Sequence, residues 1–298
     1  MIAHRHGSTQ QVLIGKTISK FTSQIKKLNS RKYHVLSAGT STVDTVDKLI
    51  KAAQQLSSIC DKSIAKIERK TPVCHATNPL DYAWAHHEQY LAKWGGFGAT
   101  TLLLGMNPGP WGMAQTGVPF GSTEMAREKL EIEPHQLFTP ANAHPKRPII
   151  GLELERQEVS GQRLWSLMFN HFGDGKAVFS NIFVVNHCPL LLLGETGKNL
   201  TPDNLPSAVM KPILEACDEH LKQVVEIMGI TRIIGVGKYA EKRARLAFSA
   251  GKSGDGVTKS GRTIAITSCW HPSPASPLAN RNDGADWREN VISVLENR

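Results

Sequence analysis

Glycine, asparagine and histidine residues follow four short apolar segments, in an arrangement that could bind a flat polar ligand and stabilise charge on it. The segments run into Gly105-Met106-Asn107-Pro108-Gly109, Asn186-His187, Gly237-Lys238 and Trp270-His271. Glycine lets the backbone approach a ligand closely, an amide both donates and accepts hydrogen bonds, and histidine can stabilise charge. Taken alone, each of these residues could equally serve a structural turn. Their joint placement favours a site for a flat polar ligand.

The four apolar segments have the length and composition of buried parallel strands, and longer helical patterns separate them. This alternation predicts an α/β fold, with three α/β/α layers and a central, mainly parallel four-stranded sheet. Ligands bind beyond the carboxyl ends of such strands, so the four segment ends should face one cleft. The predicted strands are Thr101 to Leu104, Ile182 to Val185, Arg232 to Val236 and Thr263 to Thr267. The predicted helices follow Ser160, follow Thr201-Pro202, begin near Lys238 and end the chain.

The chain begins with a basic segment. Residues 1–43 contain seven Lys or Arg residues and no Asp or Glu, which leaves only +2 of the net charge of +9 for the rest of the chain. We interpret residues 1–42 as a flexible basic arm, either a solvated tail, an organelle-targeting peptide or an arm that contacts phosphates. The spacing of apolar residues over 43–69 predicts an amphipathic helix, which could serve either as a packing element or as a partner-binding surface. The sheet-forming domain covers residues 70–298.

Several classes of protein do not fit this sequence. No apolar run is long enough to span a membrane, and the first thirty residues lack the apolar stretch of a secretory signal. The five cysteines include no C-x-x-C pair, so we expect reduced, buried thiols and no metal or other cofactor. The cysteines are Cys60, Cys74, Cys188, Cys217 and Cys269.

Longer motifs extend the pattern beyond the strand ends. They are Asn78-Pro79-Leu80-Asp81-Tyr82-Ala83-Trp84, the segment from Gly105 to Gly121, His144-Pro145-Lys146-Arg147-Pro148, Asn186-His187-Cys188-Pro189-Leu190-Leu191 and His271-Pro272-Ser273-Pro274. In order and approximate spacing, they resemble the single-strand-selective monofunctional uracil-DNA glycosylases of the uracil-DNA glycosylase superfamily. The resemblance covers about residues 70 to 298, which would form the catalytic domain, and leaves residues 1–69 largely outside.

The resemblance implies an enzyme of base excision repair that hydrolyses the N-glycosidic bond of uracil and 5-hydroxymethyluracil. Its substrates would be single- and double-stranded DNA, and its product an abasic site without strand cleavage. DNA would be the partner of a monomeric enzyme that binds neither a metal nor a membrane. A role in DNA repair favours the nucleus as the compartment of this protein. The basic, acid-poor start of the chain leaves the mitochondrion as an alternative location.

Asn107 and His271 occupy the family's two catalytic positions. An amide cannot accept a proton at neutral pH, so Asn107 would orient a water without acting as a general base. His271 would stabilise the negative charge that develops on the leaving base. The matched loops supply no residue that we identify as an activated lysine nucleophile, which fits hydrolysis without strand cleavage.

The resemblance implies that five further residues surround the base. Phe120 would stack on it, and Asn186 would offer a carbonyl to the N3 proton and an amino group to O4 of uracil. Gly109 stands where uracil-specific relatives carry a bulky aromatic, so it would leave room for a substituent at C5. The predicted base-binding residues are Gly105, Met106, Gly109, Phe120 and Asn186.

The segment after His271 resembles the family's wedge, which enters the duplex beside the flipped base. Ala275 stands where relatives place an arginine, so duplex insertion should be weaker and the preference for single strands larger. Arg281 could compensate for the missing charge. The predicted DNA-binding residues are Pro272, Ser273, Pro274, Ala275, Arg281 and Lys238.

Two other functions stay open at this point. One is a glycosylase of the same fold that acts on a deaminated purine, because the loops of the superfamily differ in the base that they accept. The other is a catalytically inert nucleic-acid-binding module, in which the glycine-rich loop only holds a phosphate. The joint presence of Asn107, Asn186 and His271 argues against the second.

Overall fold

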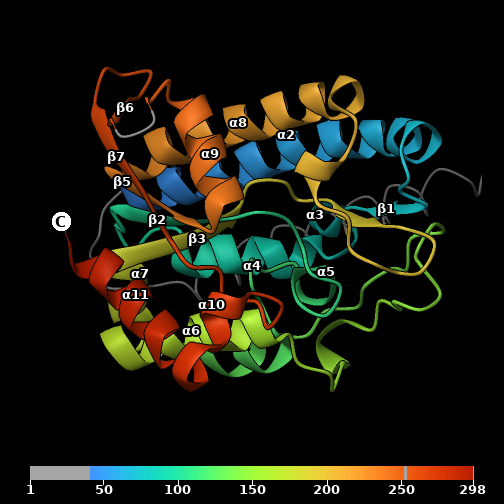
Figure 1. Ribbon diagram of the computed structural model, residues 1–298, viewed down its shortest axis with the longest axis horizontal. Helices are drawn as coiled ribbons and strands as arrows, with labels where there is room; N and C mark the ends of the chain where they lie inside the picture. The colour runs from blue at the N-terminus through green and yellow to red at the C-terminus, as the bar shows by residue number, and fades with distance from the viewer. Residues whose placement is uncertain (1–40, 252–253, 298) are drawn as a thin grey trace, which may run out of the picture. The chain divides into compact units, whose positions relative to one another are not determined.

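The computed structural model describes residues 41–251 and 254–297 (Figure 1). The predicted basic arm therefore lies outside the described residues, apart from its last two positions. Those two residues begin the first described helix, α2 (Ser41–Lys70). None of the helices in the described part of the chain is long and apolar enough to cross a membrane.

The central sheet has five strands in the order β3-β2-β5-β7-β6. The first four run parallel and contain the four segments expected from the sequence; they are β3 (Ile182–Asn186), β2 (Thr101–Gly105), β5 (Arg232–Val236) and β7 (Thr263–Cys269). The fifth, β6 (Gly256–Val257), pairs antiparallel with β7 at the edge. The expected count of four strands is thus corrected to five, because two residues are too short to give a periodic signal.

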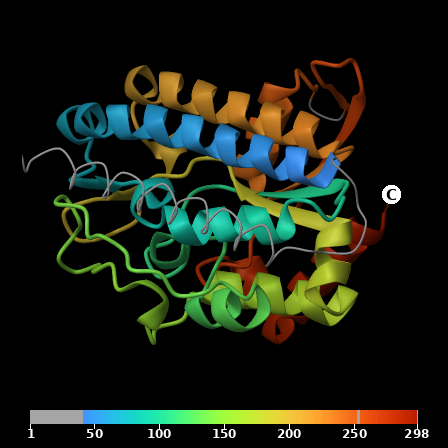
Figure 2. The same ribbon diagram turned by 180° about the vertical axis from the view of Figure 1, so that it is seen from behind.

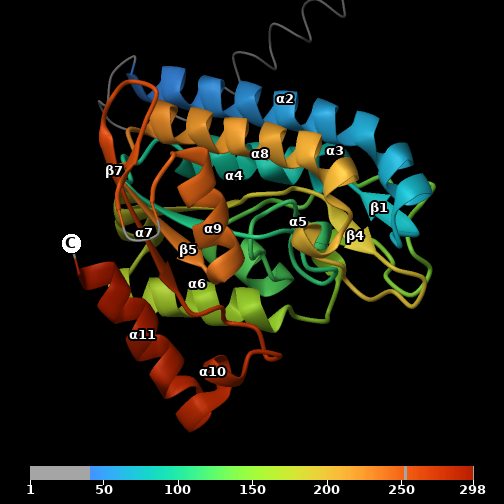
Figure 3. The ribbon, with the colours of Figure 1, turned by 45° about the horizontal axis from the view of Figure 1, so that its top comes forward.

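Helices cover both faces of the sheet. Figure 1 shows α2, α8 (Ser207–Met228) and α9 (Lys238–Ala247) on one side, with α6 (Val159–Phe172) and α11 (Ala285–Glu296) on the other. Figure 3 confirms that α2 and α8 lie side by side. Seen from behind, α4 (Trp84–Trp94) packs against the β3 edge, where the Tyr90 hydroxyl donates to the Val184 carbonyl at 3.0 Å (Figure 2). The three-layer α/β/α prediction is confirmed.

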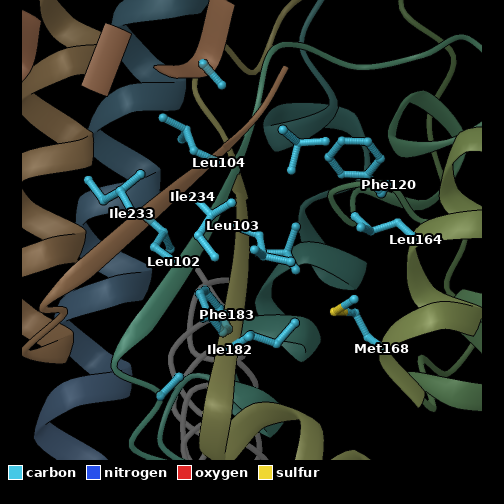
Figure 4. Close-up of a cluster of buried hydrophobic side chains, with 14 of the residues drawn as sticks. Leu102, Leu103, Leu104, Phe120, Leu164, Met168, Ile182, Phe183, Ile233 and Ile234 are labelled. Carbon is cyan, nitrogen blue, oxygen red and sulfur yellow. The ribbon is translucent and has the colours of Figure 1, made fainter. Parts of the chain in front are cut away.

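The main core surrounds the sheet and includes residues of α2, α8 and α9 on one face and of α6 and α11 on the other; Figure 4 shows the part beside α6. The strands contribute continuous apolar runs rather than alternating ones, because helices cover both of their faces. Leu164 and Met168 of α6 are one helical turn apart and point toward the sheet together. The strand residues labelled in Figure 4 are Leu102, Leu103, Leu104, Ile182, Phe183, Ile233 and Ile234, and all are fully buried.

A second core joins α2 to α8. Leu56, Cys60 and Ile67 of α2 are buried in one cluster with residues of α8, including Ile213 and Cys217. The apolar stripe of α2 therefore serves as a packing surface for the domain. Among the five cysteines, all except Cys74 are buried, so the expectation of five buried thiols is wrong at Cys74.

Two helix starts differ from the sequence expectation. Helix α6 begins at Val159, and the Glu158 side chain caps it by accepting from the Gly161 N–H, whereas Ser160 lies inside the helix. Thr201 precedes only a short 3₁₀ turn, Pro202–Asn204, and α8 begins later, at Ser207. The remaining short elements are β1 (His75–Thr77) and β4 (Leu191–Leu193), which pair antiparallel, with α3 (Pro79–Tyr82), α5 (Met113–Thr116), α7 (Gly175–Asn181) and α10 (Pro277–Asn280).

Candidate active site

The carboxyl ends of the parallel strands bring the predicted site residues to one edge of the sheet. Gly105 at the end of β2 is the register partner of Asn186 at the end of β3. On the other side, the Gly237 N–H after β5 donates to the Cys269 carbonyl at the end of β7, at 2.9 Å. Cys188 after β3 donates to the Met106 carbonyl at 2.9 Å and so holds two site loops together. The four strand ends therefore form one continuous rim.

Gly105 lies between the side chains of Asn186 and Phe120. A Cβ at this position would overlap Asn186 Oδ1 and would come within 2.6 Å of Phe120 Cε2. Glycine is thus the one residue type that fits without moving either side chain. The absence of a side chain here allows the amide of Asn186 and the ring of Phe120 to face the same space.

Asn186 carries a buried polar atom that the protein leaves unsatisfied. Its side chain is 7% exposed, and its Oδ1 has no hydrogen-bond partner among the described residues. Its Nδ2 donates only to the Met113 thioether, at 3.2 Å, and sulfur of this type is a weak acceptor. Leaving a buried acceptor unpaired costs about 1–3 kcal/mol, so such an atom needs an explanation. A ligand with an N–H group would satisfy it.

Phe120 and His271 stand together on the opposite side of the site. Their ring centroids are 5.9 Å apart and the rings are tilted by 44°. Phe120 is 8% exposed and adopts φ of 53°, an uncommon conformation for an aromatic residue. It belongs to the main core as well as to the site, so the structural and the functional interpretations of Phe120 both apply.

The protonation of His271 follows from its surroundings. Burial lowers the pKa of the imidazole to about 4, so the ring is neutral at neutral pH. Its Nδ1 accepts the backbone N–H of Ser273 at 3.1 Å. Since a neutral imidazole carries one proton, that proton lies on Nε2. His271 is therefore a neutral hydrogen-bond donor beside Phe120.

Asn107 is held on the β3 side of the rim. Its Nδ2 lies 3.4 Å from both the Leu190 carbonyl and Asn199 Oδ1, and Asn199 in turn donates to the Pro108 carbonyl at 3.0 Å. Within the described part of the chain, Asn107 Oδ1 accepts no hydrogen bond. This atom is consequently the acceptor that Asn107 can offer to a water molecule.

Gly109 faces a carboxyl group rather than open space. A Cβ on Gly109 would lie 3.2 Å from Glu158 Oε1, and one on Gly112 would lie 2.8 Å from Glu158 Oε2. Burial raises the pKa of the Glu158 carboxyl to about 7, although hydrogen bonds from Gly161 and Ser160 lower it in part. The room that the sequence suggests at Gly109 is therefore bordered by a carboxyl group that is easily protonated.

The loop after His271 is anchored to α6 by Arg163. This guanidinium donates to the Pro272 carbonyl at 3.1 Å, to the Ala279 carbonyl at 3.3 Å and to Asn280 Oδ1 at 3.1 Å. Asn280 also donates to the Pro274 carbonyl at 2.7 Å, across the loop. Ala275 is exposed between these anchors.

Two predicted DNA-binding residues are engaged elsewhere. Arg281 pairs with Asp286 of α11 at 3.6 Å, so its charge is directed toward that helix. Lys238 is exposed, but its Nζ donates to Glu241 at 2.9 Å and to Ser268 at 3.2 Å. Within the described residues, neither side chain forms a hydrogen bond or ion pair with Asn107, Asn186 or His271. In the described residues, no group of three or more His, Cys, Asp or Glu could hold a metal ion.

Comparison with known proteins gives the family. The family model of the uracil DNA glycosylase superfamily matches residues 92–295. The single-strand selective monofunctional uracil-DNA glycosylase of Rattus norvegicus is 41% identical over 218 residues, which is 73% of this chain and 75% of the rat protein. The chain belongs to this superfamily.

Other relatives carry the same description. The Mus musculus single-strand selective monofunctional uracil DNA glycosylase is 40% identical over 76% of this chain and 78% of its own length. A crystal structure of wild-type Pedobacter heparinus SMUG2 matches with a TM-score of 0.49 at 17% identity, over 74% of this chain and 85% of that one.

Sequence reasoning missed several residues of this candidate site. Glu158 is the N-cap of α6, and glutamate is not among the residues usually preferred at that position, so no local signal indicates it. Arg163 and Asn199 come from segments with no motif of their own. His187 was noticed only as a neighbour of Asn186, yet its ring bridges Asp218 Oδ1 at 2.8 Å and the Tyr239 hydroxyl at 3.0 Å. These bonds brace the end of β3 against α8 and α9.

Proposed function

We propose that this chain is a monofunctional uracil-DNA glycosylase that releases uracil and 5-hydroxymethyluracil from single- and double-stranded DNA. The observation that carries the proposal is the buried, unpaired Oδ1 of Asn186 beside Gly105 and Phe120. The base must leave the helical stack to reach this edge of the sheet, at a cost of a few kcal/mol in a duplex. Stacking on an aromatic ring, which returns about 1–3 kcal/mol per base, is the role we propose for Phe120.

Asn186 would select the base by its hydrogen-bonding edge. Uracil presents an N–H at N3 and an acceptor at O4, which complement Oδ1 and Nδ2 of the amide. Cytosine presents the opposite pattern at that edge, and each mispaired buried group costs about 1–3 kcal/mol. The weak bond from Nδ2 to Met113 is easily exchanged for a stronger one to O4.

His271 would assist departure of the base. As the glycosidic bond breaks, the electron pair passes to the base, and Nε2–H of the neutral imidazole would donate a hydrogen bond to the developing anion. A preorganised donor of this kind contributes about 2.7–4 kcal/mol to the transition state. Neutrality is an advantage in this role, because the donor needs no proton from solvent at neutral pH.

Asn107 would hold the water that attacks the sugar. Its Nδ2 is engaged by Leu190 and Asn199, which fixes the amide plane and leaves Oδ1 to accept from the water. The amide cannot take the water's proton, so the rate acceleration relies mainly on stabilisation of the leaving base. None of the residues described above around the base pocket is a lysine, and without an amine nucleophile hydrolysis ends at an abasic site.

Gly109 and Glu158 would determine which substituent is accepted at C5. A glycine admits a substituent there, and the adjacent carboxyl offers a hydrogen-bond partner to a hydroxymethyl group. A methyl group would approach the same carboxyl without such a bond, so thymine is rejected. Comparable turnover of thymine and 5-hydroxymethyluracil would contradict this selectivity.

The biological setting follows from the reaction. An enzyme that converts a damaged base to an abasic site acts in base excision repair, and we propose that it acts in the nucleus as a monomer. Its partner is DNA, and we expect the reaction to need neither a metal ion nor another cofactor.

The decisive experiment is incubation of the protein with a uracil-containing oligonucleotide, followed by alkali. Wild type should create alkali-labile sites without cleaving untreated DNA, and His271→Leu should lose at least about 100-fold in rate. Absence of alkali-labile sites with wild type would exclude the glycosylase proposal. The same assay with hypoxanthine and xanthine tests the alternative of a purine-specific enzyme, and DNA binding without base release would indicate a non-catalytic module.

A further inference from the structure

A tryptophan and two arginines form a cluster beside the candidate site. Trp111 belongs to the loop that carries Asn107, and Arg147 and Arg156 come from later segments. The guanidinium carbon of Arg156 lies 4.3 Å from the centroid of the Trp111 ring, and that of Arg147 lies 5.0 Å from it. Trp111 is half-buried, while Arg156 is exposed. Stacking on an aromatic face orients a guanidinium and leaves its N–H groups free at the edge.

Neither arginine is neutralised by an ion pair within the part of the chain that the structure describes. Arg147 donates to the carbonyl groups of Gly197 at 3.0 Å and Lys146 at 2.9 Å, and these bonds fix its position without cancelling its charge. No hydrogen bond from Arg156 is found among the same residues. Two oriented, uncompensated guanidinium groups are suited to an anion with several oxygen atoms, such as a phosphodiester.

The cluster is joined to the candidate active site by covalent and hydrogen-bonded connections. Trp111 lies between Gly109 and Gly112, whose Cα atoms both face Glu158, and Arg156 comes two residues before Glu158. The turn that contains Gly197 also reaches Asn107, through Asn199. The cluster therefore lies on the β2–β3 side of the rim, whereas the loop after His271 leaves from β7.

We propose that Trp111, Arg147 and Arg156 form a second DNA-contact surface, which binds backbone phosphates of the damaged strand on the side of the base pocket opposite the His271 loop. The proposal rests on the function proposed above and adds a contact that none of the predicted DNA-binding residues provides. A strand that crosses the rim would be held on both sides of the flipped nucleotide. Such contacts act on single strands and duplexes alike, because both carry the same phosphates.

The test measures binding and its salt dependence. Arg147→Gln, Arg156→Gln and the double variant are made in the His271→Leu background, so that a uracil-containing single-stranded oligonucleotide stays intact. Each arginine that contacts a phosphate should contribute about 0.7 to the slope of log binding constant against log salt concentration, so the double variant should lose about 1.4. Binding at low salt should weaken by about 10-fold or more for the double variant. Lys51→Gln, a change at an exposed residue of α2, serves as the control.

A structural role is separated from a phosphate contact by two further measurements. With His271 intact, the double variant should raise KM for uracil release and leave kcat within about 2-fold, because binding would be equally weakened in ground and transition states. Trp111→Phe should retain more affinity than Trp111→Leu, since only phenylalanine keeps an aromatic face for the arginines.

Unchanged affinity and salt slope in the double variant, with wild type still releasing uracil, would overturn this proposal and leave the glycosylase function standing. If the wild-type protein does not release uracil, the glycosylase function itself is refuted.

Discussion

Gly105 and Asn186 face each other across the ends of two paired strands, and a Cβ on Gly105 would overlap the Oδ1 atom of Asn186. Gly105→Ala must therefore displace either the Asn186 amide or the Phe120 ring. We expect single-turnover release of uracil to fall by about 100-fold, because a displacement of about 1 Å at a reacting site costs that much. The backbone of Gly105 has no positive φ, so the fold should tolerate alanine.

Gly251→Ala is the matched control for this change, because a Cβ there would meet no atom of the described residues within 4 Å. It should leave both activity and melting temperature unchanged. Activity of Gly105→Ala close to that of wild type would show that the space between Gly105 and Asn186 is not used by the base.

His271 should give the reaction an unusual pH dependence. Burial lowers the pKa of its imidazole to about 4, so the neutral, donating form already predominates at pH 5 and increases little further as the pH rises. Single-turnover rates between pH 5 and 8 should show no inflection near 6.5, the ordinary value for histidine. The profile is best measured in a Glu158→Gln background, because the Glu158 carboxyl, with a pKa of about 7, would also titrate in this range. An inflection near 6.5 that disappears in His271→Leu would contradict a neutral donor.

Glu158 should make the protein less stable as the pH rises. The pKa of its carboxyl is raised from 4.5 to about 7 in the folded protein, so the folded state holds a proton that the unfolded state has released. Stability from this group is complete below pH 4.5 and is lost as the pH rises through 7, to a limit of about 3 kcal/mol. Glu158→Gln should abolish this part of the pH dependence of the free energy of unfolding, as measured by urea denaturation at pH 5 and pH 8. An equal loss of stability in wild type and Glu158→Gln would argue against a protonated carboxyl.

The parallel strands could be predicted from the sequence because each is a short, uninterrupted apolar run that helices cover on both faces. The same reasoning could not find β6, which has two residues, or the β1–β4 pair, whose partners are far apart in the chain. The start of α6 was misplaced because serine is usually the stronger helix cap, whereas here the Glu158 carboxyl takes the Gly161 N–H.

The residues of the candidate site also fall into two groups, those that could be predicted from the sequence and those that could not. Residues that directly follow a strand, such as Asn107, Asn186 and His271, could be predicted because the topology of a parallel sheet places all strand ends at one edge. Glu158 and Arg163 reach that edge from α6, and no local pattern indicates which loop a helix side chain will contact. Tertiary packing alone determines these contacts, so they become visible only in the folded chain.

Ala275 should limit action on duplex DNA. It is exposed in the loop after His271, at a position where the family resemblance leads us to expect an arginine, and Arg281 pairs with Asp286 of α11. Ala275→Arg should therefore raise the ratio of duplex to single-strand activity, since a positive charge near the wedge adds a phosphate contact. The ratio is obtained from kcat/KM on the two substrates with the same uracil context. No change in the ratio would remove Ala275 as the cause of a single-strand preference.

Arg163 should affect the same ratio from the opposite side of that loop. Its three hydrogen bonds reach Pro272, Ala279 and Asn280, so one planar guanidinium fixes both ends of the segment that would enter a duplex. A lysine has a single ammonium group and cannot reproduce this geometry. We expect Arg163→Lys to lower duplex activity about 10-fold more than single-strand activity, because a loosened wedge must be ordered at the moment of insertion.

Gln162→Ala is the control for Arg163→Lys, because the neighbouring Gln162 donates to Glu124 and, within the described residues, forms no hydrogen bond with the His271 loop. Melting temperatures of both variants show whether α6 remains packed. If Arg163→Lys lowered single-strand and duplex activity by the same factor, the arginine would act on His271 or on the fold as a whole. A selective loss on duplex DNA would instead identify Arg163 as the residue that holds the wedge ready for insertion.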